Sequence, residues 1–431
     1  MSEKVELLSP AGNLEKLKIA INYGADAVYA GVSHFSLRIR AGKEFTFETF
    51  KEGIDYAHAR GKKVYATING FPFNSQIDLL KKHIEKMAEV KPDGFIVAAP
   101  GVVKLCREIA PDIDVHLSTQ ANVLNYLDAQ VFWDLGVKRI VVAREISLKD
   151  VQQIKKHLPD MEIEIFVHGS MCFAYSGRCL ISAVQSGRVP NRGSCANDCR
   201  FNYTLYAESE NQNTLFRLEE DPGVGTYIFN SKDMNLASHI QEIMDSGAVD
   251  SLKIEGRTKS PYYAAVTANA YREAIDDYYA DTFDADKYQR ELHTTKNRGF
   301  TDAYLVHRPF EKTDSQNHEY ALSKGSYEVT GLVTEDEDHF MCKYKVYPQD
   351  EIEIFAPRDV EIVECDNELG KIYKKEDGIY YISFNKILTE TNKELESVHS
   401  GNTNKIQLPG KLPYLTMLRV ETDQEGEAFK K

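Results

Sequence analysis

Over its first 260 residues the chain repeats one unit, in which a short apolar, β-rich run is followed by a polar turn and an amphipathic helical pattern. The intervening patterns, such as 13–24 and 46–61, space apolar residues three and four apart, with Gly24 and Gly61 as expected C-caps. Strands that alternate with helices predict parallel strands with crossover helices, and eight such runs favour a closed TIM-type (β/α)8 barrel over an open doubly wound sheet. The eight runs are VELLSP (5–10), DAVYAG (26–31), KVYATIN (63–69), GFIVAA (94–99), VHLSTQ (115–120), RIVVAR (139–144), IEIFVHG (163–169) and SLKIEG (251–256).

One interval breaks the repeat, because more than 80 residues separate the seventh run from the eighth. An insertion of about residues 170–250 is therefore expected after the seventh strand. It begins with a cysteine-bearing loop and continues into 201–229, where alternation and Gly, Pro and Asn punctuation predict a small β excursion. The pattern of 231–247 predicts a helix before the eighth strand.

The pattern of apolar and polar residues changes in the last quarter of the chain. A long helical pattern over 260–281 and a shorter one over 284–293 are followed, from about Glu319, by short strand-like runs between charged turns. These runs predict a small all-β domain, barrel-like or a sandwich, over residues 319–420, after a barrel domain over residues 1–310. The runs are YEVTGLV, HFMCKYKV, DEIEIFAP, VEIVECD, IYYISF and KIQLPG.

Composition narrows the class of protein. With 431 residues and 42% hydrophobic content, the chain can bury a large core. Residues 1–30 mix charges among the apolar positions, so neither a signal peptide nor a membrane span is predicted, and we expect a cytoplasmic protein. The net charge of −14 argues against a uniformly basic surface that coats nucleic acid. Locally, four arginines and one aspartate between Met171 and Arg200 give a net charge of +3, which suits an anionic ligand or a solvated loop.

The active site of a TIM-type barrel lies at the C-terminal ends of its strands. His168 is a candidate base there, with a satisfied rim histidine as the alternative. Lys253, Glu255 and Arg257 alternate, so they point to one side of the eighth strand, where two cations flanking a carboxylate make either a site for an acidic small molecule or a salt-bridged interior. The polar residues at the strand ends are Ser9, Asn69, Ser118, Thr119, Gln120, Asn122, Arg144, Glu145, His168, Lys253, Glu255 and Arg257.

Four of the seven cysteines, Cys172, Cys179, Cys195 and Cys199, lie within 28 residues and follow the spacing Cys-x6-Cys-x15-Cys-x3-Cys. In a reducing compartment such a group indicates a metal or catalytic site more often than disulfides. Four converging thiolates satisfy either a tetrahedral zinc or an iron–sulfur cluster. The wide first pair favours the cluster, and four unrelated thiols are the third alternative. The remaining cysteines are expected to be packing residues: Cys106, Cys342 and Cys365.

Five motifs in order resemble the peptidase U32 family. They are ELLSPAGNLEKLKIAINYGADAVYAG, HLSTQANVLN, FVHGSMCFAYSGRCLIS, NRGSCANDCRFNY and SLKIEGR. NHEYALSKGSYEVTG resembles the opening of that family's C-terminal β domain, so the resemblance covers nearly the whole chain. It implies a [4Fe-4S] cluster on four cysteines and hydroxylation without oxygen, with prephenate as co-substrate.

Within the family, four cysteines in one window together with a β domain resemble the branch that hydroxylates the wobble uridine of tRNA at carbon 5. The tRNA anticodon loop and prephenate are then the expected partners, with no membrane. The resemblance implies Cys172, Cys179, Cys195 and Cys199 as cluster ligands, and charge and position assign the prephenate site to Lys253, Glu255 and Arg257. From their place on the rim, His168 and Glu255 are the candidate catalytic groups, and Arg144, Gln120 and Asn122 join Lys253 and Arg257 as candidate substrate-binding groups. Further candidates are Arg38 or Arg40 for the acid, and Phe173, Tyr175 and Tyr203 for stacking on the base.

Two other functions stay open. One is a collagenase-like U32 peptidase, although the sequence has neither a His-Glu-x-x-His nor a Gly-x-Ser-x-Gly motif. The other is a zinc-stabilised RNA-binding protein without catalysis. The sequence also leaves open whether a partner protein or a second copy of the chain completes the site.

Overall fold

The protein is described by a computed structural model, which divides into two compact units: Met1–Leu292 with Asn297–Ser323, and His293–Lys296 with Lys324–Lys431. The residues described are 4–32, 35–36, 45–172, 174–190, 195–201, 206–209, 214–217, 230–306, 315–317 and 325–422. Four candidates therefore lie outside the described residues: Arg38, Arg40, Phe173 and Tyr203. The domain boundary expected between residues 310 and 319 also falls largely outside them.

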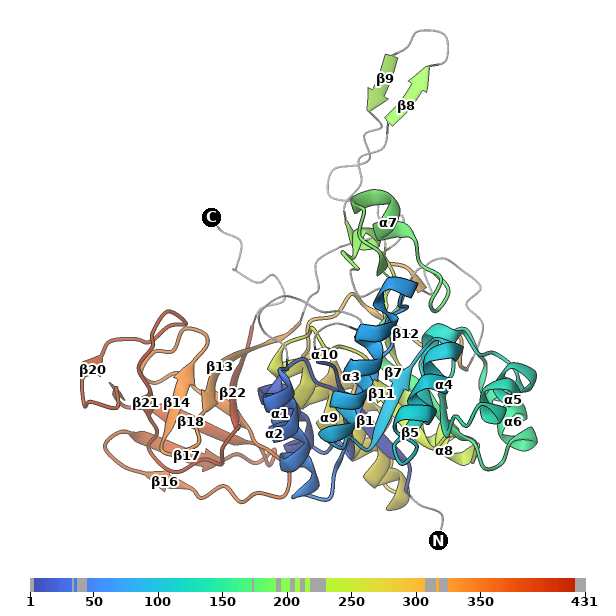
Figure 1. Cartoon of the computed structure of the whole chain (residues 1–431). Coiled ribbons are helices and arrows are strands. Elements are labelled where there is room, and N and C mark those ends of the chain that lie inside the picture. The colour runs from blue at the N-terminus through green and yellow to red at the C-terminus, as the bar shows by residue number, and fades with distance from the viewer. Residues whose placement is uncertain are drawn as a thin grey trace. The chain divides into compact units, whose positions relative to one another are not determined.

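In the described part of the first unit, eight parallel strands close into a barrel, which confirms the TIM-type fold (Figure 1). The ring closes because the last strand pairs on both sides, with Leu252 opposite Leu7 in the first strand and opposite Ile165 in the seventh. In ring order the strands are β1 (Glu6–Pro10), β2 (Ala27–Ala30), β3 (Lys63–Ile68), β4 (Gly94–Val97), β5 (Asp114–Leu117), β6 (Arg139–Val141), β7 (Glu162–Ser170) and β11 (Ser251–Ile254).

Helices surround this barrel, so its strands are buried on both faces. Leu7 and Val28 on the outer strand faces share one apolar core with Leu17 and Phe50 from the helices. The helices are α1 (Leu14–Asn22), α2 (Phe47–His58), α3 (Ile77–Glu89), α4 (Pro100–Ile109), α5 (Tyr126–Asp134), α6 (Leu148–His157), α8 (Ile240–Asp245), α9 (Pro261–Tyr279) and α10 (Ala285–His293). Among the described residues, no helix is both long and apolar enough to cross a membrane.

The barrel interior holds a small apolar layer and, toward the N-terminal ends of the strands, an ionic network. Arg139 lies at the centre of the network, with its guanidinium 2.5 Å from Glu6, 2.7 Å from Glu162 and 3.2 Å from Glu164. Burial raises the pKa of Glu6, but Arg139 and a hydrogen bond from Tyr65 outweigh it, so the pKa lies below its ordinary value. The apolar layer consists of Leu8, Ala27, Tyr29, Tyr65 and Ile96.

The insertion after β7 contains α7 (Ile181–Ser186) and the hairpin of β8 (Tyr206–Ser209) with β9 (Thr214–Arg217), where the sequence predicts a β excursion. The helix expected over 231–247 is wrong in its first part. Asp233–Asn235 forms the short strand β10, which pairs antiparallel with the end of β7, and β12 (Phe300–Thr301) pairs with β10. The local helical pattern is overridden because β7 extends beyond the barrel rim and offers backbone partners there.

The second unit is all-β, as predicted. Its described residues form one eight-stranded sheet in the order β16-β17-β18-β15-β22-β13-β14-β21, which packs its own apolar core around Phe340, Phe384 and Leu418. Beside it, β19 (Ile387–Leu388) pairs with β20 (Glu394–Leu395). The sheet strands are β13 (Tyr327–Val333), β14 (His339–Cys342), β15 (Ile352–Phe355), β16 (Cys365–Asp366), β17 (Gly370–Lys374), β18 (Tyr380–Phe384), β21 (Ile406–Gln407) and β22 (Met417–Glu421).

Gly169 is required where β7 approaches the segment after β11. Its φ is +113°, and an added Cβ would lie 2.5 Å from the carbonyl oxygen of Glu255. We expect Gly169→Ala to lower the free energy of unfolding by about 3 kcal/mol, from backbone strain and displacement of the neighbouring chain, measured by urea unfolding. The control is Gly61→Ala, with φ +66° and no atom within 4 Å of the added Cβ, which should cost only about 1 kcal/mol. Equal losses would contradict the close approach.

Candidate active site at the barrel mouth

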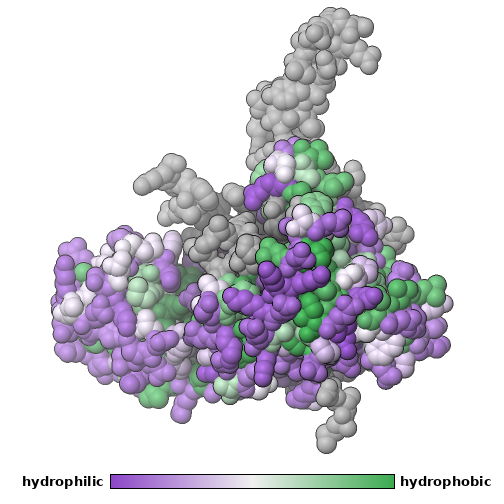
Figure 2. All heavy atoms as spheres, in the orientation of Figure 1, coloured by the Kyte–Doolittle hydropathy of each residue, from purple (hydrophilic) through white to green (hydrophobic). Residues whose placement is uncertain are grey.

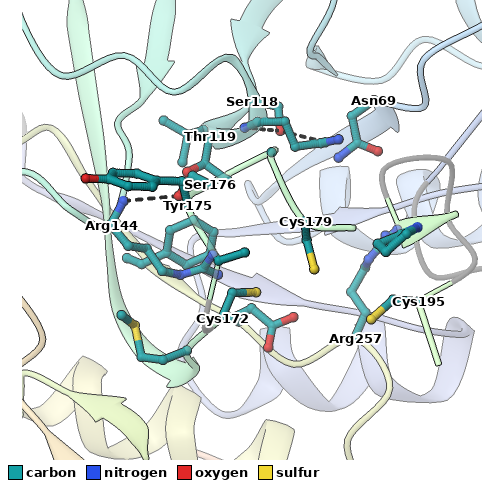
Figure 3. A pocket seen from close by; sticks show the side chains of 18 of the residues that line it. Asn69, Ser118, Thr119, Arg144, Cys172, Tyr175, Ser176, Cys179, Cys195 and Arg257 are labelled. Carbon is teal, nitrogen blue, oxygen red and sulfur yellow. Dashed lines mark hydrogen bonds between the residues drawn. The ribbon is translucent and has the colours of Figure 1, made fainter. Parts of the chain in front are cut away.

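A cavity of about 170 Å³ lies at the C-terminal ends of the barrel strands, between the strand ends and the cysteine-bearing segment (Figure 3). This is where a TIM-type barrel places its active site. Of the polar residues selected from the sequence, those that line the cavity are Asn69, Ser118, Thr119, Gln120, Arg144, Lys253, Glu255 and Arg257. Four others do not belong to its described lining: Ser9, Asn122, Glu145 and His168.

Arg257 reaches from the end of β11 to the ends of β2 and β3. Its Nη1 donates to Ser36 Oγ at 2.9 Å and to Thr67 Oγ1 at 3.1 Å. The two hydroxyl oxygens are themselves 2.5 Å apart, so they hold one edge of the guanidinium at the cavity wall. Gly31 makes room for this contact, because an added Cβ would lie 2.2 Å from Ser36 Oγ.

Lys253 lies on β11 and joins the cavity to the ionic network below. Its Nζ is 2.5 Å from Glu164 Oε1 and 4.5 Å from the centre of the Tyr29 ring. Burial lowers the pKa of Lys253, and Glu164 opposes that shift by favouring the ammonium form. The sequence left two interpretations of Lys253 open: a salt-bridged residue of the barrel interior, or part of a site for an acidic small molecule. Lys253 is salt-bridged in the interior and also lines the cavity, so its position agrees with both.

The end of β6 holds the cysteine-bearing segment in place. The guanidinium carbon of Arg144 lies 3.8 Å from the centre of the Phe166 ring. Glu145, which follows it, accepts a hydrogen bond from the Ser176 backbone N–H at 2.9 Å and another from its hydroxyl at 3.1 Å. Ser176 lies between Cys172 and Cys179, so this contact positions the loop that carries both cysteines.

The two residues expected to be catalytic differ in their surroundings. Glu255 is buried and lines the cavity, and its backbone carbonyl accepts a hydrogen bond from Tyr263 Oη at 2.6 Å. His168 lies behind it, among the rings of Tyr263, Tyr271 and Phe300, with Nδ1 3.3 Å from Tyr271 Oη. His168 is only 2% exposed and does not belong to the described lining of the cavity. A general base has to come within hydrogen-bond reach of the substrate, so Glu255 fits this role better than His168 does.

The turn after β5 brings a polar group to the same cavity. It is a 3-10 turn, η2 (Thr119–Ala121), that ends at Asn122 with φ +59°. Gln120 is 5% exposed, and its Nε2 is buried without a hydrogen-bond partner in the described structure. The cysteine loop packs directly on this turn, since an added Cβ on Gly177 would lie 2.2 Å from the Gln120 carbonyl oxygen.

The four clustered cysteines all line the cavity, and Figure 3 shows Cys172 and Cys179 between Arg144 and Arg257, with Cys195 beside Arg257. Burial raises the pKa of Cys179, and the nearby Cys172 and Cys195 raise it further. Burial likewise raises the pKa of Cys199, with Arg200 opposing the shift and the other three cysteines adding to it. Among the described residues, no three His, Cys, Asp or Glu side chains are grouped so that they could hold a metal ion.

The outer surface of the same segment is unusually apolar. Figure 2 shows apolar side chains gathered over α7, and Tyr175 and Phe201 are 63% and 53% exposed nearby. Arg178 and Arg188 are also exposed on this segment. We call this set the insertion surface; it consists of Tyr175, Arg178, Leu180, Val184, Arg188, Val189 and Phe201.

Sequence reasoning missed the groups beneath the cavity. Arg139 and Glu164 are charged residues within the apolar strand patterns RIVVAR and IEIFVHG. A charge on the inward-facing side of such a strand was the signal that could have identified them. Phe166 supports Arg144, and Gly177 permits contact with the η2 turn. These partners come from different strands, so their pairing required the register of the barrel.

Comparison with known proteins gives a consistent set of relatives. The model of peptidase family U32 matches residues 12–315. The "tRNA hydroxylation protein P" of Helicobacter pylori is 64% identical, over 97% of this chain and 99% of that protein. A protein of the same name from Escherichia coli is 39% identical, over 82% of this chain and 87% of that protein. The "23S rRNA 5-hydroxycytidine C2501 synthase" of Escherichia coli is 34% identical, over 64% of this chain and 40% of that protein.

Glu164 provides a test of the ionic network that supports the cavity. We expect Glu164→Gln to lower the free energy of unfolding by about 3–5 kcal/mol, because it leaves Arg139 and Lys253 buried with too little negative charge. Urea unfolding followed by circular dichroism measures the loss. The matched control is Glu108→Gln, which breaks an exposed pair with Lys104 and should change stability by less than about 0.5 kcal/mol. A Glu164→Gln protein as stable as the control would contradict the network.

Proposed function

The chain belongs to peptidase family U32, and on that premise we propose that it is a tRNA hydroxylase that forms 5-hydroxyuridine at the wobble position without dioxygen, using prephenate as co-substrate. The observation that carries this proposal is the composition of one cavity, which joins four cysteine thiols to the cations of the barrel mouth. The relatives named as tRNA hydroxylation proteins support the choice of tRNA.

A [4Fe-4S] cluster is proposed as the cofactor, held by Cys172, Cys179, Cys195 and Cys199, with zinc as the alternative. The donor chemistry fits, because four thiols are the ligands that such a cluster takes and all four line the same cavity, although no three of them are grouped closely enough in the described structure to hold a metal ion. When bound, a cluster whose four irons are each held by one of these thiolates would supply an electron carrier at the cavity. The contact of Glu145 with Ser176 holds the thiol-bearing loop against the strand ends.

The acidic co-substrate is assigned to the cationic wall of the cavity. Replacing a C–H bond by C–OH adds an oxygen atom to the base and removes two electrons from it. Without dioxygen, the oxygen atom has to come from a hydroxyl group or water and another oxidant has to accept the two electrons; prephenate, which carries a hydroxyl group, is proposed as the co-substrate that is reduced. Prephenate is a dicarboxylate, and a guanidinium binds a carboxylate through charge-assisted hydrogen bonds. Arg144 and Arg257 both line the cavity, with Cys172 and Cys179 between them in Figure 3, and the two guanidinium groups are proposed to bind the carboxylates of prephenate.

The RNA is proposed to meet the insertion surface. A wobble base is unpaired in the anticodon loop, and proteins recognise such bases by stacking them on aromatic rings. Tyr175 lines the cavity and is also exposed, so its ring can contact both a base and the solvent-facing loop. Arg178 and Arg188 supply positive charge for the phosphates next to it.

The two alternative functions predict a different metal content of the protein and different reaction products. A U32 peptidase would cleave peptides, and its support is the name of the family. A zinc-stabilised RNA-binding protein would hold zinc at the four cysteines and leave its RNA unmodified. Neither accounts for cations and thiols that share one cavity.

The central test is Cys179→Ala in a strain that lacks the wild-type gene. We expect the purified wild-type protein, isolated anaerobically, to contain about four iron and four sulfide per chain. The variant should lose that cluster and the 5-hydroxyuridine of bulk tRNA, measured by nucleoside mass spectrometry, while its circular dichroism stays unchanged. The control Cys365→Ala, in β16 of the second unit, should keep both. Zinc in place of iron, or 5-hydroxyuridine retained in Cys179→Ala, would contradict the proposal.

Arg257 tests the site proposed for prephenate. We expect Arg257→Ala to raise the KM for prephenate by about 10- to 100-fold, because it removes a charge-assisted hydrogen bond to a carboxylate. The Kd for tRNA should change by less than about threefold, since the guanidinium lies inside the cavity rather than on the insertion surface. Arg60→Ala, an exposed arginine on the Tyr56 ring, is the control and should change neither. Equal weakening of prephenate and tRNA binding would move Arg257 to the RNA surface.

A further inference from the structure

Gln120 has an amide whose orientation is set by its neighbour. The Ser118 hydroxyl oxygen accepts a hydrogen bond from the Gln120 backbone N–H at 3.5 Å. The hydroxyl hydrogen is thus available to Gln120 Oε1, which lies 3.1 Å away. With Oε1 accepting that hydrogen bond, the amide keeps its Nε2 as the group still to be paired.

That Nε2 group is buried and has no partner among the described residues. A buried N–H donor without a partner costs free energy, so the site gains when a ligand supplies an acceptor. Gln120 belongs to the cavity lining, and its one polar side-chain atom without a partner in the described structure is a neutral donor. The ligand group that satisfies it is a neutral carbonyl oxygen, because Arg144 and Arg257 already provide cations for carboxylates in the same cavity.

Pyrimidine bases differ in this respect at carbon 4. Uracil carries a carbonyl oxygen there, which accepts a hydrogen bond, whereas cytosine carries an amino group, which donates one. Carbon 4 is bonded to carbon 5, so a contact at carbon 4 also fixes the position of the carbon to be hydroxylated. An amide that only donates would accept uracil and leave the amino group of cytosine facing a second donor.

We propose that Gln120 selects uracil over cytosine by donating from Nε2 to the carbonyl oxygen on carbon 4 of the target base. The inference rests on the proposed function, since it names the base that this cavity takes. The position of the residue supports it, because Gly177 packs on the Gln120 carbonyl two residues before the cluster candidate Cys179. A base held by Gln120 thus lies beside the loop that carries the thiols.

The test exchanges the donor for an acceptor with Gln120→Glu. The substrates are two stem-loop RNAs that differ only in uridine or cytidine at the target place, and the hydroxylated nucleosides are quantified by mass spectrometry with the holoenzyme and prephenate. We expect the ratio of rates on uridine and cytidine to fall by about 10- to 100-fold in Gln120→Glu. Gln120→Ala should lower the rate on uridine without raising that on cytidine. Gln152→Glu, an exposed residue on α6, makes the same chemical change and should leave the ratio as in wild type.

A second readout keeps the inference separate from the proposed function. The affinities of both RNAs are measured by fluorescence anisotropy with the same proteins, without turnover. If wild type hydroxylates neither RNA, the proposed function fails, while the ratio of affinities still tests Gln120. A wild-type ratio in Gln120→Glu, in both rate and affinity, overturns the inference. A raised KM for prephenate with an unchanged base ratio also overturns it, because Gln120 would then bind the acid.

Discussion

The cavity depends on one buried interaction, the contact of Glu164 with both Arg139 and Lys253 inside the barrel. Charged groups cannot stay in a barrel interior unless they are paired, because burial penalises each charge by several kcal/mol in effect. Arg139 satisfies three carboxylates from β1 and β7, and Glu164 in turn holds the Lys253 ammonium below the cavity. The charged groups below the cavity are therefore held in place by the paired strands of the barrel.

Above these charged groups, contacts between the strand ends and the cysteine-bearing segment form the rest of the site. Glu145 after β6 binds Ser176, and the η2 turn after β5 packs on Gly177. Both contacts hold the stretch between Cys172 and Cys179, so the thiols are positioned by the rigid part of the barrel. This explains how a long insertion can deliver cysteines into a cavity whose other walls are strand ends, and why Arg144, Arg257 and Gln120 line the same cavity as the thiols.

Much of this organisation was predictable, for physical reasons that also set the limits. The alternation of strand and helix patterns predicts the barrel, and the rule that parallel strands point their C-terminal ends to one rim predicts that Gln120, Arg144, Lys253, Glu255 and Arg257 line one cavity. Orientation within the rim was not predictable. His168 has the right strand end, yet its ring lies against Tyr271 and Phe300. The first part of the helix expected over 231–247 forms β10 instead, because the end of β7 offers it backbone partners, while α8 forms in the rest. Such outcomes depend on tertiary partners that the local pattern does not contain.

The charge of the cavity lining differs in sign from the net charge of the chain. The chain carries a net charge of −14, yet Arg144, Arg200, Lys253 and Arg257 all line the cavity, against Glu255 as its acidic group in the described lining. The chain as a whole therefore repels anions, while the described lining of this cavity attracts them. On the proposed function, selectivity then comes from what fits in this cavity: a carboxylate at the guanidinium groups of Arg144 and Arg257, and a neutral acceptor at the Gln120 amide. A site of this kind discriminates by leaving the wrong group unpaired in a buried position, which costs more than a lost surface contact.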